Sequence, residues 1–287
     1  MITSLQSATG AEARRPVALS PGLRRTLHLG WSRTIIEVKE IIRDPMGGFF
    51  LLLLPVLLLL VFGSIFDDTI EGTGVSRRQY FVAGIIASSV VGTTFSNLAI
   101  GIAVQRHQGV LKRLGGTPLP RTSYFIGRIG AASAVTLVQV AVMLAIGVLA
   151  FGVDLPQSGT HWLRLGWVLI LGVAVGCTLG LAYTRLIPSA KSAPAITQPP
   201  YLILQFISGV FFVFTELPGW MQNVATVFPL RWIAQGLRSV FLPDAFGANE
   251  AGGGWQLEWV AGVLAIWLVV GTLLALRGFR WTNDGAA

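Results

Sequence analysis

Six stretches of this chain contain no charged residue and are about long enough to cross a lipid bilayer. A helix needs about 20 residues to cross ~30 Å of hydrocarbon, and a charge at the bilayer centre costs at least ~2.5–3.5 kcal/mol. Charged residues make up only 12% of the 287 residues, against about 25% in soluble domains. The sequence therefore predicts an all-α integral membrane protein with six transmembrane helices, at Pro45–Phe66, Gln79–Gln105, Ile129–Val153, Leu165–Thr184, Ser192–Thr215 and Trp259–Leu276.

The segment before the first stretch has the pattern of an amphipathic helix. From residue 22 to 44, Leu23, Leu27, Trp31 and Ile35 recur every four residues, with basic residues between them. Such a helix beside a first span is expected to lie in the membrane interface. The chain thus divides into a disordered cytoplasmic tail at 1–21, the interfacial helix at 22–44, a six-span domain at 45–281 and a cytoplasmic tail at 282–287.

One apolar segment does not fit a simple crossing. Gly219–Leu242 contains two arginines, Arg231 and Arg238, and Pro229 divides it into halves that are too short to span. We expect a pair of re-entrant outer half-helices before span six.

The distribution of charge indicates the orientation. Most Lys and Arg residues fall in the segments that share a side with the N-terminus, and most acidic residues fall in the others. Because basic loops remain in the cytoplasm, both termini are expected there. The net charge of +8 is then a topology signal, and the partner it predicts is the lipid bilayer, with no nucleic acid.

The sequence lacks the motifs that bind nucleotides or metals or that catalyse reactions. It has no phosphate-binding P-loop motif, one cysteine and three widely separated histidines. None of the six stretches carries a carboxylate, Lys or Arg, which disfavours an ion-coupled transporter or an intramembrane enzyme. We expect no catalytic residue, no metal site and no cofactor bound by this chain.

The spans do contain neutral polar residues, at Ser89, Thr93, Ser96, Asn97, Gln139, Gln205 and Ser208. One interpretation is hydrogen bonding between packed membrane helices, which commonly use such residues. The other is a substrate path lined by Ser89, Thr93, Asn97, Gln139, Gln205 and Ser208.

Two motifs resemble a known family. The first, Gln105–Leu114 followed by Thr117-Pro118-Leu119, lies in a basic cytoplasmic loop where we expect one short helix, Val104–Leu114. The second is Leu217-Pro218-Gly219-Trp220 with Pro229-Leu230 and Leu237-Arg238. From about Gly22 to Trp281 the chain resembles the permease subunit of ABC-2 type exporters, which include the daunorubicin-resistance permeases. The acidic residues of the family's first motif are replaced by Gln105 and His107.

The resemblance implies roles for these residues and for other chains. A coupling helix between spans two and three would contact a separate ABC ATPase subunit, which carries ATP and Mg. The permease would pair with a second copy or a homologous permease in the bacterial inner membrane. It would export an amphipathic drug, lipid or glycan from the cytoplasm or inner leaflet. Coupling would use Arg33, Glu37, Arg106, Gln108, Gly109, Leu111, Lys112, Arg113 and Leu114; an outer gate would use Trp220, Pro229 and Arg238.

Two other functions remain open from the residues alone. The same spans could form a membrane scaffold or sensor subunit without a substrate of its own. An ion-coupled secondary transporter could bind its ion through backbone carbonyls. ATP-dependent transport separates both alternatives from an ABC exporter.

Overall fold

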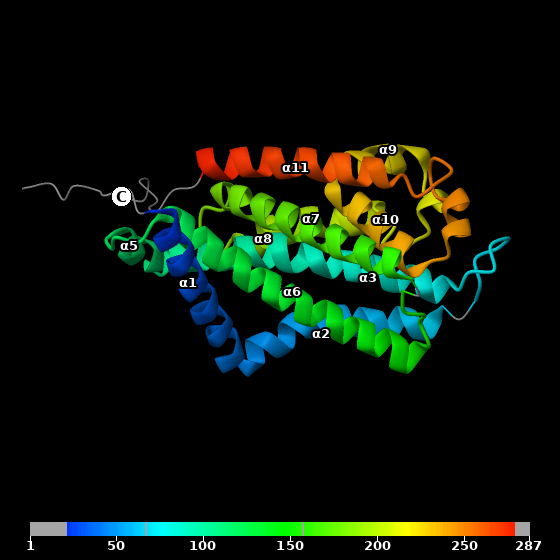
Figure 1. Ribbon diagram of the computed structural model, residues 1–287, viewed down its shortest axis with the longest axis horizontal. Coiled ribbons are helices and arrows are strands. Elements are labelled where there is room, and N and C mark those ends of the chain that lie inside the picture. The colour runs from blue at the N-terminus through cyan, green and yellow to red at the C-terminus, as the bar shows by residue number, and fades with distance from the viewer. Residues whose placement is uncertain (1–21, 67, 157, 279–287) are drawn as a thin grey trace, which may run out of the picture.

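The chain forms a bundle of long helices with short helices gathered at its two ends (Figure 1). The computed structural model describes residues 22–66, 68–156 and 158–278, in which the regular elements are helices and no strand occurs. The predicted tails at 1–21 and 282–287, and the last three residues of the predicted domain 45–281, lie outside the described residues. The all-α prediction is confirmed.

Five helices of this part of the chain are long and apolar enough to cross a membrane. They match predicted spans one, two, three, four and six. Span two is continuous but contains a π turn, η1, between α3 and α4. The elements are α2 (Pro45–Ile65), α3 (Arg77–Val91) with η1 (Gly92–Asn97) and α4 (Leu98–His107), α6 (Arg121–Phe151), α7 (Gly159–Tyr183) and α11 (Leu257–Gly278).

The helix at predicted span five is shorter than expected. α8 covers Ala193–Ile207, only 15 residues, and the chain turns at Gly209, which has a φ of +72°. This left-handed conformation is favourable for glycine and commonly ends helices. The count of six spans therefore stays a prediction. The other short elements are α9 (Gly219–Val227), α10 (Pro229–Phe241), and the 3₁₀ turns η2 (Thr184–Leu186), η3 (Phe214–Glu216) and η4 (Asp244–Asn249).

The prediction of one helix over Val104–Leu114 is wrong. α4 continues to His107, and a separate short helix, α5, covers Val110–Gly115. Gly109 between them has a φ of +72°, which breaks the helix because residues in a right-handed helix need a negative φ. The chain can therefore change direction at Gly109.

The N-terminal helix α1 (Leu23–Arg43) packs on α6 through small and polar residues. Its buried residues are Thr26, Gly30, Thr34 and Glu37. A side chain at Gly30 would place its Cβ only 2.6 Å from Ile126, so glycine permits this close approach. The apolar stripe found in the sequence stays exposed, as at Leu23, Leu27 and Trp31.

Glu37 joins α1 to α6 electrostatically. Its carboxylate pairs with Arg128 of α6 at 2.5 Å and with Arg33 of α1 at 3.0 Å, and its side chain is only 3% exposed. A buried charge needs such partners. The cluster therefore fixes α1 against the start of α6.

A second ion pair lies at the other end of the bundle. Arg238 of α10 is fully buried and donates to Glu250 at 2.5 Å and to the Gly209 carbonyl oxygen at 3.3 Å. Its guanidinium lies 4.7 Å from the centre of the Tyr80 ring in α3. The Tyr80 hydroxyl in turn accepts a hydrogen bond from the Phe214 N–H. Arg238 therefore holds together α3, α10 and the turn that follows α8.

We expect Glu250→Gln to lower the free energy of unfolding by about 3–5 kcal/mol, because Arg238 would remain buried without its counter-charge. Thermal unfolding in detergent measures the change. The control is Asp244→Asn. Asp244 accepts a hydrogen bond from Arg164 at 2.8 Å, which lowers the pKa of its carboxyl, but its side chain is 62% exposed. Such a pair contributes about 0–1 kcal/mol, so equal losses in the two variants would contradict the prediction.

Candidate substrate cavity and coupling surface

The π turn η1 gives span two an irregular turn in the middle of the bundle. Such turns are rare and frequently occur at functional sites. The turn packs against two glycines of α7, and a Cβ at Gly180 would come within 2.8 Å of the Thr94 carbonyl oxygen. Thr94 also donates its hydroxyl to the Val90 carbonyl oxygen at 2.7 Å. Close packing on α7 therefore accommodates the widened turn.

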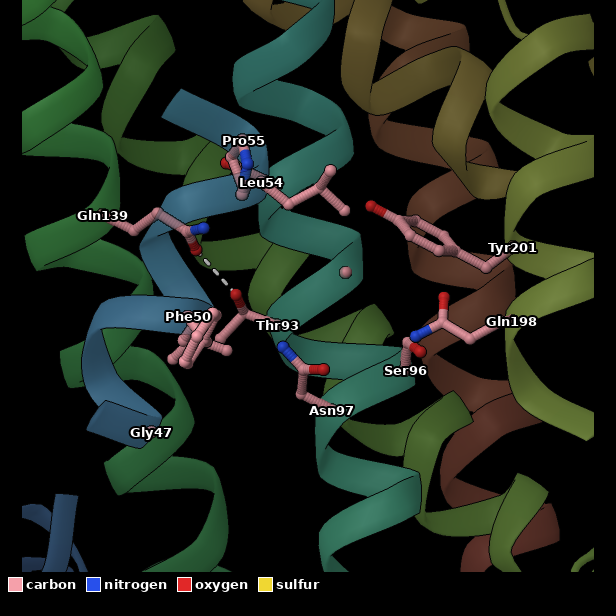
Figure 2. Close-up of a pocket in the computed structure, with 13 residues that line it drawn as sticks. Gly47, Phe50, Leu54, Pro55, Thr93, Ser96, Asn97, Gln139, Gln198 and Tyr201 are labelled. Carbon is pink, nitrogen blue, oxygen red and sulfur yellow. Dashed lines mark hydrogen bonds between the residues drawn. The ribbon is translucent and has the colours of Figure 1, made fainter. Parts of the chain in front are cut away.

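A cavity of about 350 Å³ lies beside this turn. Figure 2 shows Gln198 and Tyr201 reaching toward the turn from α8, with Gln139 of α6 on the opposite side. None of its lining residues carries a formal charge. They are Gly47, Phe50, Leu51, Leu54, Pro55, Ser89, Gly92, Thr93, Ser96, Asn97, Gln139, Gln198 and Tyr201.

Some polar groups of the cavity are paired with each other. Thr93 donates its hydroxyl to the Gln139 side-chain oxygen at 2.6 Å (Figure 2). The Tyr201 hydroxyl lies 2.8 Å from the Ser88 carbonyl oxygen, to which it donates, and 2.9 Å from the Ser88 hydroxyl. These bonds connect α3 to α8 and η1 to α6 across the cavity walls.

The Ser96 hydroxyl has no such partner. It is buried, and among the described residues no group hydrogen-bonds to it. An unsatisfied buried hydroxyl costs about 1–3 kcal/mol, so a ligand in the cavity would gain by pairing with it. Asn97 and Gln198 add two side-chain amides to the same lining. The cavity therefore offers hydrogen bonds to a ligand held against apolar and aromatic walls.

The residues predicted for a substrate path divide into two groups. Ser89, Thr93, Asn97 and Gln139 line the cavity, whereas Gln205 and Ser208 do not. These last two are buried in and just after α8.

Sequence reasoning missed Gln198 and Tyr201 as lining residues. A signal was present, since Gln198, Tyr201 and Gln205 recur at intervals of three and four and so share one face of α8.

The residues predicted to contact an ATPase differ in their exposure. Lys112 and Arg113 are exposed on α5, and Gln108 is exposed in the turn before it. Leu111 is fully buried and anchors α5, and Leu114 is half-buried. Of these residues, Leu111 has no surface with which to contact another protein, whereas the exposed Gln108, Lys112 and Arg113 do.

Three further residues that were predicted to take part in coupling make internal contacts. Arg106 donates to the backbone carbonyl oxygens of Thr184 and Ile187, which ties α4 to the turn before α8. Arg33 and Glu37 belong to the cluster with Arg128. Their roles are therefore in positioning α1 and the turn at η2.

The predicted gate residues lie in different environments. Trp220 is 63% exposed on α9, Pro229 is the buried first residue of α10, and Arg238 is fully buried in its ion pair. In the part of the chain that the structure describes, no group of three or more His, Cys, Asp or Glu side chains could hold a metal ion.

Residues 31–242 match the family model of the ABC-2 type transporter. The chain belongs to the ABC-2 type transporter family. The match runs from α1 to the end of α10 and so includes the cavity and α5.

Relatives within this family are transport permeases. The chain is 25% identical over 255 residues to the inner membrane transport permease YadH of Escherichia coli (strain K12), covering 85% of this chain and 93% of YadH. It is 24% identical over 255 residues to the doxorubicin resistance ABC transporter permease protein DrrC of Mycobacterium tuberculosis (strain ATCC 25618 / H37Rv), covering 86% and 89%. The multidrug ABC transporter permease YbhR of Escherichia coli (strain K12) is 27% identical over 172 residues, 58% of this chain and 45% of YbhR.

In this ABC-2 chain, Gly92 should be required to leave room for Tyr201 in the cavity wall. A Cβ at Gly92 would lie 2.6 Å from the Tyr201 hydroxyl, so Gly92→Ala displaces Tyr201 and removes bonds to Ser88 worth about 1 kcal/mol each. We expect a lower melting temperature in detergent.

The control is Gly147→Ala in α6, where the nearest atom would be 3.6 Å away. Alanine stabilises a helix interior by roughly 0.5–1 kcal/mol relative to glycine, so this variant should be as stable as the parent or more so. Equal effects at the two positions would contradict the role of Gly92.

Proposed function

We propose that this chain is the transmembrane permease subunit of an ATP-driven exporter that moves amphipathic molecules. The neutral polar cavity beside the π turn carries this proposal, because it combines hydrogen-bonding groups with aromatic walls at the centre of a family member's bundle. A separate ABC ATPase subunit would hold ATP and Mg. Doxorubicin, named in one relative, is a suitable first probe.

The sixth crossing belongs to the same proposal. Contacts at both ends of the α8 segment support it, since Ala193 clusters with Ala99 and Ala103 of α4, and Glu216 pairs with Arg77 at the start of α3 at 3.6 Å. α8 and residues 208–216 together then run the length of span two. Irregular backbone at membrane depth is tolerated where protein buries it, and Ser208, Val210 and Phe214 are buried.

The re-entrant outer half-helices are likewise supported by a contact. The Trp267 indole donates to the Val227 carbonyl oxygen at 2.7 Å. Trp267 lies halfway along α11, and Val227 ends α9. α9 would then enter from the outer side, reach the middle of the membrane and return as α10.

The proposed orientation places α5 and both termini in the cytoplasm. It is supported by the basic residues of α1, α5 and the α7–α8 connection, which include Arg24, Lys112 and Lys191, and by acidic residues near the opposite end such as Glu71 and Glu258. A second copy or a homologous permease would pair with this chain and complete the path, and the exposed apolar residues of α2 suit such a contact.

The exposed cations of α5 should bind the ATPase subunit. We expect Lys112→Glu/Arg113→Glu to abolish co-purification of the ATPase without unfolding the permease, because both side chains are exposed. Leu111 is unsuitable for this test, since an acid there would be buried. Charge reversal at exposed Glu71, at the other end of the bundle, is the control and should leave co-purification unchanged. Retained ATPase in the double variant would refute coupling through α5.

Ser96 allows binding to be separated from folding. Ser96→Ala removes an unsatisfied buried hydroxyl, so stability should stay equal or rise, whereas ATP-dependent doxorubicin uptake into inside-out vesicles containing both subunits should fall several-fold. Ser133→Ala is the matched control, because its hydroxyl pairs with the Ile129 carbonyl oxygen within α6. Equal doxorubicin uptake by Ser96→Ala and by the parent, or uptake that persists without ATP, would contradict the proposal.

A further inference from the structure

A second cavity, of about 590 Å³, opens on a different face of α8. One side of it is α8, represented by Leu204, and the other is the packed pair of α7 and α11, represented by Leu179 and Leu274. Phe95 of the π turn also lines it. Gln198 and Tyr201 do not belong to this lining, so α8 separates a polar cavity from an almost entirely apolar groove.

The groove has one formal charge, Arg185. This arginine is exposed in η2, and among the described residues it has no hydrogen-bond or ion-pair partner. The turn that carries it is fixed, because Arg106 donates to the carbonyl oxygens of Thr184 and Ile187 on either side. The cation is thus held at one end of an apolar groove.

The apolar part of the groove is shorter than the hydrocarbon of one bilayer leaflet. It extends along α11 from Trp267, which stacks on Phe228 near mid-helix, to Leu274. Seven helical residues cover about 10 Å, and half of a ~30 Å hydrocarbon core is about 15 Å. Arg185 lies in η2, after the end of α7, and the remaining ~5 Å of the leaflet would place it near the lipid head groups.

We propose that this groove binds an anionic phospholipid from the leaflet at the α5 end, with an acyl chain between α8 and α11 and the phosphate on Arg185. Apolar walls favour a hydrocarbon chain, and a guanidinium pairs with a phosphate through charge-assisted hydrogen bonds. A second copy of this chain would need an acidic residue opposite Arg185, whereas an anionic lipid supplies its own charge. The site stabilises the position of α8 and does not depend on transport.

The test compares two phospholipids with the full chain purified in a neutral detergent. Added dioleoyl phosphatidylglycerol should raise the melting temperature, and native mass spectrometry should show it retained on the protein. Dioleoyl phosphatidylcholine should do so much less. Arg185→Gln should weaken phosphatidylglycerol retention about tenfold, which corresponds to ~1.4 kcal/mol for one charge-assisted contact. Lys191→Gln, an exposed cation in the same connection outside the groove, should leave retention unchanged.

A second variant tests the apolar part. Leu274 is 53% exposed, so Leu274→Trp should fold normally while it obstructs the groove and weakens retention of the lipid. Equal effects of the two lipids, or equal effects of Arg185→Gln and Lys191→Gln, would overturn the proposal. A change in the monomer–dimer ratio of Leu274→Trp with no effect of lipid would assign the groove to a second copy instead. None of these outcomes depends on an ATPase subunit.

Discussion

The buried ion pair between Arg238 and Glu250 is the interaction on which the arrangement of the bundle depends. Inside a membrane protein an uncompensated charge is so costly that its partner must stay in place. Arg238 also bonds to the Gly209 carbonyl oxygen and lies over Tyr80. One side chain thereby fixes α10 against α3 and fixes the end of α8. Because α8 contributes a wall to both cavities, Arg238 helps to hold both walls in place.

α8 presents two chemically different faces to its surroundings. Gln198 and Tyr201 face the uncharged polar cavity, whereas Pro200 and Leu204 face the apolar groove. A ligand that hydrogen-bonds fits the first face, and a hydrocarbon chain fits the second. Because the same short helix forms a wall of each cavity, a molecule bound in the groove would also act on the position of Gln198 and Tyr201.

The opposite end of the bundle is connected by charged groups and by packing. Leu111 anchors α5, and Arg106 ties α4 to the turn before α8. Glu37 joins α1 to Arg128 of α6. α5 is therefore connected to α4 along the chain, and α4 is connected through Arg106 to the turn that precedes α8. The cations of α5, Lys112 and Arg113, remain exposed, while Arg106, Leu111 and Glu37 make internal contacts.

The sequence by itself determined the membrane class, the five long apolar helices and four of the thirteen residues that line the candidate cavity, Ser89, Thr93, Asn97 and Gln139. Those features follow from local rules: each charge excludes its segment from hydrocarbon, and Ser89, Thr93 and Asn97 recur at helical spacing. Tertiary structure decided the rest. Glu37 and Leu111 became internal rather than accessible, α8 ended at Gly209, and Gln198 and Tyr201 entered the lining. Which face of a helix is buried depends on the neighbour it packs against, and periodicity within one segment contains no information about that neighbour.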